Sequence, residues 1–97
     1  MSETKIDISR ASKAIRDSRF VEALSMLESN LAKDPDHLES LYFAAVCSRY
    51  LKNYKDSQKY LENLLTKAPD MGRAYQELGH LSKAVGNEEN AASHYRQ

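Results

Sequence analysis

The sequence repeats with a period of 34 residues, and this repeat limits the possible folds more than any other feature of the chain. A shift by one period superposes identical residue types at several places along the chain. These pairs are Pro35 and Pro69, Asp36 and Asp70, Lys33 and Lys67, Leu31 and Leu65, and Asn53 and Asn87. Periods of this length are typical of arrays in which one supersecondary unit stacks on the next. A single unit cannot bury both of its faces, so we expect several copies packed side by side.

The third copy shows most clearly that the unit is a helical hairpin. Tyr75, Leu78 and Leu81 recur at three- and four-residue steps, which is the spacing of one face of an α-helix. The Gly86-Asn87 pair interrupts this pattern and predicts a turn. The apolar stripe resumes beyond the turn, which predicts a second helix in the same unit.

Equivalent positions of the three copies hold residues of similar size. Small residues form two columns where helices can cross closely, and a third column is large and apolar. The first small column is Ala11, Ala45 and Gly79, the second is Ala23, Ser57 and Ala91, and the large column is Leu27, Leu61 and Tyr95.

With two helices per unit, small residues at two crossing points and a proline closing the second helix, the chain resembles the tetratricopeptide repeat (TPR) family. The resemblance implies an all-α fold, a right-handed α-solenoid of about three antiparallel helix pairs. The six helices would form a single domain over residues 1–97, with units at about 4–37, 38–71 and 72–97. The third unit is incomplete and its last helix truncated. The resemblance is weakest in the first unit, where Asp7 and Arg10 occupy slots that usually hold large apolar side chains.

Local signals set the expected helix limits. We expect helices at about Lys5–Asp17, from Phe20 to the residues before Pro35, and at about Tyr54–Lys67. Pro35 and Pro69 set the ends of the last two, because proline disfavours helical geometry in the residue before it. Asp36, with Glu39 three residues on, predicts a capping box for the third helix. The predicted core is Phe20, Ala23, Leu27, Leu31, Leu41, Ala45, Tyr54, Leu61, Leu64, Leu65, Tyr75, Leu78 and Gly79.

Charge and cysteine content narrow the class of protein. Fourteen lysine and arginine residues balance fourteen aspartate and glutamate residues, so no net field attracts nucleic acid or an anionic membrane. No apolar run is long enough to span a membrane, and the first residues lack an apolar signal core. The single cysteine, Cys47, fits a reducing compartment and is predicted to pack in the core. We therefore expect a cytoplasmic protein without nucleic-acid or membrane partners.

Residue patterns for catalysis are weak, and we expect no enzyme activity, no cofactor and no metal site. The three glycines do not form a phosphate-binding loop. The histidines His37, His80 and His94 lack the four-residue spacing of a helical metal pair. Cys47 and His80 could in principle act as a catalytic nucleophile and its base. We instead expect the Cys47 side chain to pack in the core.

The TPR resemblance implies a concave groove lined by the first helix of each unit. The wider set of groove positions includes Ile8, Ile15, Glu39, Val46 and Ala84, and Glu39 is its only acidic member. The residues expected to bind a ligand are Lys5, Ser12 and Arg16 in the first unit, Tyr42, Arg49 and Tyr50 in the second, and Arg73, Gln76, His80 and Lys83 in the third.

This groove is expected to be mildly basic and to bind a protein segment or peptide with acidic groups. Arg49 and Arg73 would pair with carboxylates bidentately, and Lys83 would act as a point charge. Tyr42 and Tyr50 offer flat surfaces for the peptide backbone. The alternative is that these residues are ordinary solvated surface charges.

A second resemblance concerns the passage that follows Ala68-Pro69, from Gly72 to Leu81. It resembles the TPR region that precedes a sulfotransferase domain in some bacterial fusion proteins. The resemblance implies that the chain is the N-terminal TPR module of a larger enzyme, where it positions substrate or mediates oligomerisation. The open C-terminal end would expose Leu78, Leu81, Val85 and Tyr95, which also raises the expectation of a homodimer through this end.

Overall fold

The computed structural model describes the backbone of residues 6–95 and the side chains of residues 6–89. This part of the chain is all-α and contains five helices. They are α1 (Ser9–Arg16), α2 (Phe20–Lys33), α3 (Leu38–Tyr50), α4 (Tyr54–Lys67) and α5 (Gly72–Tyr95).

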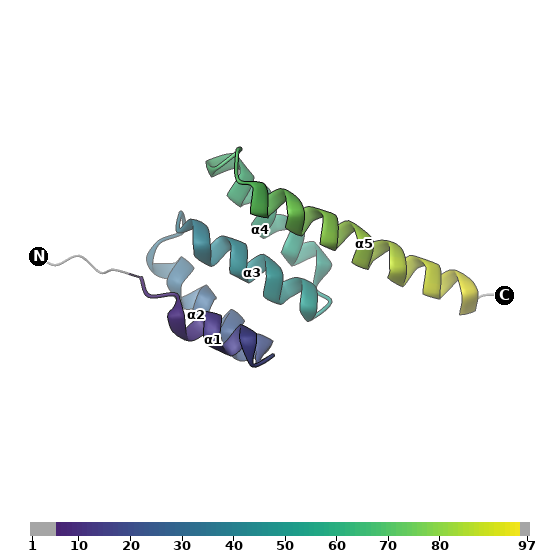
Figure 1. Ribbon diagram of the computed structural model, residues 1–97, viewed down its shortest axis with the longest axis horizontal. Coiled ribbons are helices and arrows are strands. Elements are labelled where there is room, and N and C mark those ends of the chain that lie inside the picture. Colours follow the sequence, from purple (N-terminus) through teal and green to yellow (C-terminus); the bar gives the residue numbers. More distant parts are fainter. Residues whose placement is uncertain (1–5, 96–97) are drawn as a thin grey trace, which may run out of the picture.

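The helices form two layers. In Figure 1, α1, α3 and α5 lie in the nearer layer and α2 and α4 behind them. Each helix packs against the next one in the chain, and α3 also contacts α5. This neighbour-on-neighbour packing is what a helical repeat array requires.

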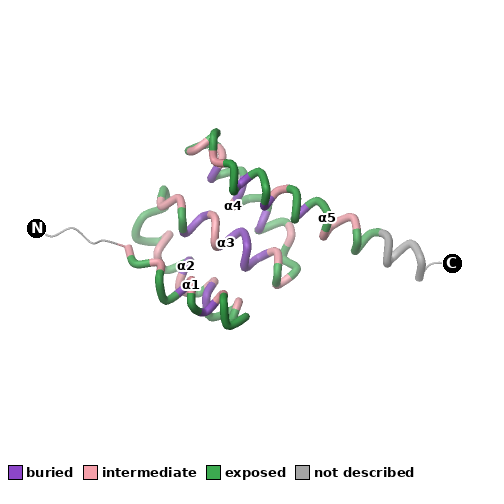
Figure 2. The backbone as a smooth tube through the Cα atoms, viewed as in Figure 1, coloured by how far each residue is buried: buried purple, intermediate pink, exposed green. Residues whose placement is uncertain are grey.

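The core consists of two clusters that meet at α3. Leu27 and Cys47 belong to the cluster of the first hairpin, and Leu41 and Leu61 to the cluster of the second. Figure 2 shows that the buried residues of α3 run along most of its length. Of the predicted core, Ala23, Leu27, Leu41, Ala45, Leu61 and Leu64 are buried. Phe20, Leu31, Tyr54, Leu65 and Leu78 are partly buried and pack against these clusters.

The turns inside the first two hairpins have the same geometry. Ser18 and Lys52, which are one 34-residue period apart, both adopt a left-handed backbone with φ of 61° and 66°. The amide that follows each of them closes the turn. Arg19 N donates to Ala14 O at 2.8 Å, and Asn53 N donates to Ser48 O at 2.8 Å. This bond pattern is the left-handed helix ending that satisfies the last carbonyls of a helix.

The third hairpin differs from the sequence-based expectation. The predicted turn at Gly86-Asn87 is not formed, because α5 continues through it as one helix of 24 residues. The six expected helices are therefore five in the described part of the chain. In the first two hairpins the second helix packs between two first helices, since α2 and α4 each touch the helix before and the helix after them, and residues 88–95 make no such packing here because they continue α5.

The uninterrupted α5 also changes which of its residues are buried. Tyr75 is 53% exposed and Gly79 is exposed, so both are wrong as core predictions. A Cβ atom added at Gly79 would have no neighbour within 4 Å, because the second helix that should cross at this notch is not folded back. Leu81, which was expected on the uncovered surface, is instead buried against the second cluster.

Two helix starts also differ from the predicted ones. The α1 helix begins at Ser9 rather than near Lys5, because the Asp7 carboxylate accepts hydrogen bonds from Ser9 N and Ser9 Oγ just before it. The N-cap of α3 is His37 and not Asp36. Its ring Nδ1 accepts a hydrogen bond from Ser40 N at 3.2 Å.

Candidate functional site

Of the residues predicted to bind a ligand, all those that the structure describes lie on α1, α3 and α5, the three helices of one layer (Figure 1). We call this set the front surface. Six of its members are exposed, namely Arg16, Tyr50, Arg73, Gln76, His80 and Lys83. Ser12, Tyr42 and Arg49 are partly buried, and Lys5 lies outside the described residues. Val46 of the wider set is buried in the core.

Arg73 and Tyr42 form the best-defined contact on the front surface. The Arg73 guanidinium carbon lies 4.5 Å from the centre of the Tyr42 ring, which is a cation–π distance. The contact joins the start of α5 to α3. Neither Arg73 nor Lys83 takes part in an ion pair within the described residues. Arg73 is thus oriented by an aromatic ring while its N–H donors face no carboxylate of that part of the chain.

Arg49 is engaged differently, because Glu77 of α5 pairs with it. Arg49 Nε contacts Glu77 Oε2, and Arg49 Nη2 donates to Glu77 Oε1 at 3.3 Å. The Glu77 side chain is 3% exposed and that of Arg49 is 18% exposed. Burial lowers the pKa of the Arg49 guanidinium, but the hydrogen bond and the charge of Glu77 outweigh this and leave the pKa above its ordinary value.

Sequence reasoning missed Glu77, although the sequence contains a signal for it. Ala74, Glu77 and Leu81 follow helical spacing, and all three are buried on the same side of α5. A carboxylate within an apolar stripe requires a partner of opposite charge. The identity of that partner is a tertiary feature, since Arg49 lies 28 residues away in sequence.

Tyr50 extends this contact towards the first hairpin. Its ring stacks on the Phe20 ring with centroids 4.4 Å apart, and the Arg49 guanidinium lies 4.5 Å from the Tyr50 ring centre. Phe20, Tyr50, Arg49 and Glu77 therefore form one chain of contacts across α2, α3 and α5. On the front surface, Arg49 and Tyr50 link the repeats, and Arg16 on α1 and Arg73 and Lys83 on α5 are exposed cations outside the ion pairs of the described residues.

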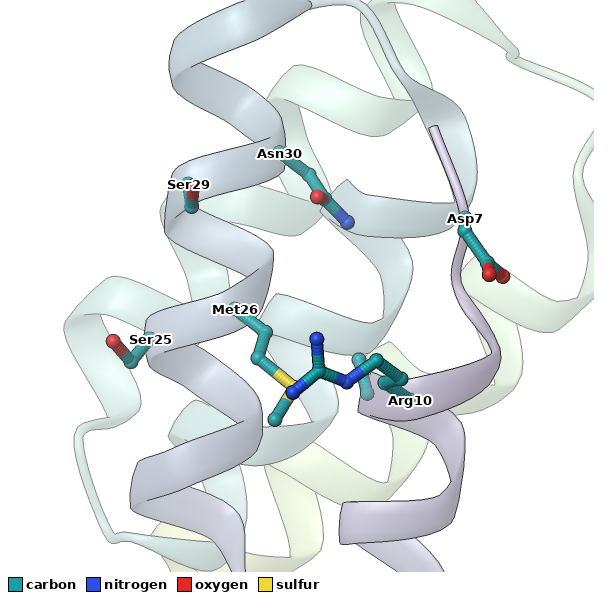
Figure 3. Close-up of a pocket in the computed structure, with 7 residues that line it drawn as sticks. Asp7, Arg10, Ser25, Met26, Ser29 and Asn30 are labelled. Atoms are coloured by element: carbon teal, nitrogen blue, oxygen red, sulfur yellow. The ribbon is translucent and has the colours of Figure 1, made fainter. Parts of the chain in front are cut away.

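A polar hollow of about 300 Å³ lies between α1 and α2. Figure 3 shows the Arg10 side chain reaching towards Met26 of α2, with Asn30 above it and Asp7 to one side. The Ser9 hydrogen bonds hold the pKa of Asp7 below its ordinary value. Asp7 and Arg10 stand where large apolar residues would fill the hairpin, so this hollow is the structural result of the weak repeat match in the first unit.

Reactive groups are scarce in the described part of the chain. Cys47 is fully buried, and burial raises the pKa of its thiol to about 11, so the thiol stays protonated at neutral pH. His80 is exposed on α5 and forms no hydrogen bond with Cys47. Among the side chains of residues 6–89, no group of three could hold a metal ion. None of the helices in the described part of the chain is long and apolar enough to cross a bilayer.

The family comparison agrees with this architecture. Residues 14–79 match the family model described as "Tetratricopeptide repeat". The matched span runs from the last residues of α1 to the first part of α5 and includes all of α2, α3 and α4. Neither a curated protein nor a solved structure matches the chain. The comparisons give no support to the resemblance to sulfotransferase fusion proteins.

Proposed function

Because the chain belongs to the tetratricopeptide repeat family, we propose that it is a non-catalytic scaffold whose front surface binds an acidic peptide or protein segment. Repeats of this family generally mediate protein–protein interaction. The fold supplies a rigid, extended surface, while the side chains on that surface determine the partner. The proposal therefore depends on the front surface and not on the fold alone.

The observation that carries the proposal is the Arg73 guanidinium carbon 4.5 Å from the centre of the Tyr42 ring. This cation–π contact positions the guanidinium, whose N–H donors can pair with a carboxylate through two parallel hydrogen bonds. Such bidentate pairing matches the geometry of a carboxylate. Because Arg73 is already oriented, less side-chain entropy is lost when a carboxylate binds.

Lys83 extends this surface along the same helix. Ten residues separate it from Arg73, which corresponds to about 15 Å along α5. An extended peptide covers that distance in four to five residues at roughly 3.3 Å each. We therefore expect a ligand with two acidic groups about five residues apart, one on Arg73 and one on Lys83.

Arg49 is assigned a supporting role in this proposal. Its guanidinium is satisfied by Glu77, so binding a ligand carboxylate would require it to leave a nearly buried partner. By joining α3 to α5, the pair instead fixes the distance between Tyr42 and the remaining cations on α5.

A titration followed by amide NMR tests this function. The probe is a ten-residue peptide with two glutamates five positions apart, and the same peptide with two glutamines serves as the reference. We expect shift changes at Tyr42, Arg73 and Lys83, and a loss of affinity of about tenfold in Arg73→Gln. Arg19→Gln, which replaces an exposed arginine in the turn between α1 and α2, is the matched control and should bind normally. Equal affinity in the two variants would place the binding surface elsewhere.

A further inference from the structure

Gly86 occupies a special position in the repeat. It lies one period after Lys52 and two after Ser18, the two residues with a left-handed backbone. Glycine adopts that conformation more easily than serine or lysine. Yet no glycine of the described chain has a positive φ, and Gly86 lies inside α5. The residue best suited to form the turn is therefore held in the helical conformation.

The straight helix leaves one face of α5 without its usual partner. In the second hairpin, the small residues Ala45 and Ser57 meet where the helices cross, and Ser57 Oγ donates to Ala45 O at 2.8 Å. One period later, the same pairing would join Gly79 to Ala91. Twelve residues separate these two positions, which is about 18 Å along a continuous helix. Gly79 therefore cannot meet Ala91 of its own chain, and the face with Tyr75 and Gly79 stays exposed.

We propose that two copies of this chain exchange residues 88–95, so that each α5 covers the exposed face of the other. The repeat fixes the register of this pair. Gly79 of one copy lies opposite Ala91 of the other, and Tyr75 lies opposite Tyr95, in an antiparallel arrangement. Val85 is midway between positions 79 and 91, so the two-fold axis passes beside it. Such a contact is self-complementary and closes at two subunits.

The charges along α5 fit an antiparallel pair. With Glu77 paired to Arg49, the first half of the helix carries the unpaired cations Arg73 and Lys83. Glu88 and Glu89 follow in the second half. Antiparallel pairing brings Lys83 of one copy next to the acidic residues of the other, on both sides of the axis, so the second copy and an acidic ligand compete for Lys83 while Arg73 stays available to the ligand. A parallel pair would instead place like charges together.

A contact within the chain also favours the straight helix. Lys52 Nζ lies 3.2 Å from Glu88 Oε2, which ties α5 beyond Gly86 to the turn between α3 and α4. This pair is exposed and contributes little by itself. Its position shows that the residues just after Gly86 lie beside the turn between α3 and α4 and not on the Tyr75 face of the same chain.

Disulfide trapping tests the register directly. In a Cys47→Ser background, we expect Gly79→Cys with Ala91→Cys to oxidise to a dimer on non-reducing gels. The crossing of small residues brings the two backbones within disulfide range. The matched control is His80→Cys with Ala91→Cys. Position 80 lies about 100° from position 79 around the helix, so this pair should crosslink far more slowly. A disulfide within one chain, or none at all, would overturn the exchange.

Sedimentation equilibrium of Gly86 variants provides the second test. We expect the wild type to be a dimer. Gly86→Ala keeps the continuous helix that α5 already forms, so this variant should remain a dimer of about the same affinity. Gly86→Pro breaks the helix and should give a monomer, while circular dichroism should show that α1 to α4 remain folded. A monomeric wild type, or a dimer that persists in Gly86→Pro, would contradict the proposal.

Discussion

At the scale of single residues, buried polar and ionisable groups have the largest effects in this molecule. Glu77 is 2% exposed, and its charge is offset by Arg49. Cys47 is fully buried and has no such partner, so burial keeps its thiol neutral. Each of the two residues lies in an otherwise apolar environment, where water screens charges little. A change of charge at either position should therefore have a measurable effect on the free energy of unfolding.

Glu77→Ala should lower the free energy of unfolding by about 3 kcal/mol, because it leaves the Arg49 charge partly buried without a partner. Urea denaturation measures the change. The control is the double variant Arg49→Met with Glu77→Met, which removes both charges and keeps similar volume. It should recover most of the loss, since replacing a buried ion pair by apolar groups is often neutral. A double variant as unstable as Glu77→Ala would argue against the pair.

Cys47 predicts a loss of stability at alkaline pH. Its pKa in the folded chain is about 11, compared with an ordinary value of 9.0, so the unfolded chain ionises first as the pH rises. The contribution of Cys47 to stability is therefore complete below pH 9 and falls between pH 9 and 11, by about 3 kcal/mol in total. Thermal melts across this range should show the decline. Cys47→Ala should show a smaller decline, and identical pH slopes in the two proteins would contradict the assignment.

At the scale of helices, the sequence predicted most of the structure, because most of the signals are local. The prolines, the apolar spacing and the columns of small residues located α2 and α4 closely. The turn at Gly86 could not be predicted in the same way. Its formation depends on whether a second helix finds a surface to pack on, which is a property of the assembled array. The exposure of most front-surface residues could likewise be predicted from helical spacing. The pairing of Arg49 with Glu77 could not be predicted, because it joins two helices that are distant in sequence.

The start of α3 gives a prediction about a single helix end. His37 Nδ1 accepts from Ser40 N and lies 2.7 Å from Ser40 Oγ. His37→Ala removes the acceptor and should destabilise the protein by about 1 kcal/mol, measured by urea denaturation. His37→Asn keeps a side-chain acceptor and should recover most of that loss. Equal stability in both variants would show that the cap contributes nothing.

At the scale of the whole molecule, α5 makes the shape unusually long. The chain measures 63 × 29 × 19 Å, with a radius of gyration of 14.8 Å. A compact chain of this length would have a radius of about 12.5 Å. Figure 1 shows the reason, since the end of α5 projects beyond the other four helices. The folded body therefore depends little on the projecting segment.

A chain ending after Gly86 should retain its fold. Truncation removes the exposed Lys52–Glu88 pair but none of the core clusters, so the free energy of unfolding should fall by no more than about 1 kcal/mol. Urea denaturation of the truncated chain at low protein concentration checks this. A much larger loss would mean that residues 87–97 stabilise the body of the molecule directly.

The polar hollow of the first hairpin has a consequence for how far association can proceed. Asp7 and Arg10 make that end of the array hydrophilic, whereas the other end offers Tyr75 and an open glycine notch. In the proposed exchange, the Tyr75 faces of two copies cover each other, so the contact closes at two subunits. The hydrophilic first hairpin takes no part in that contact and presents charged side chains to any further copy.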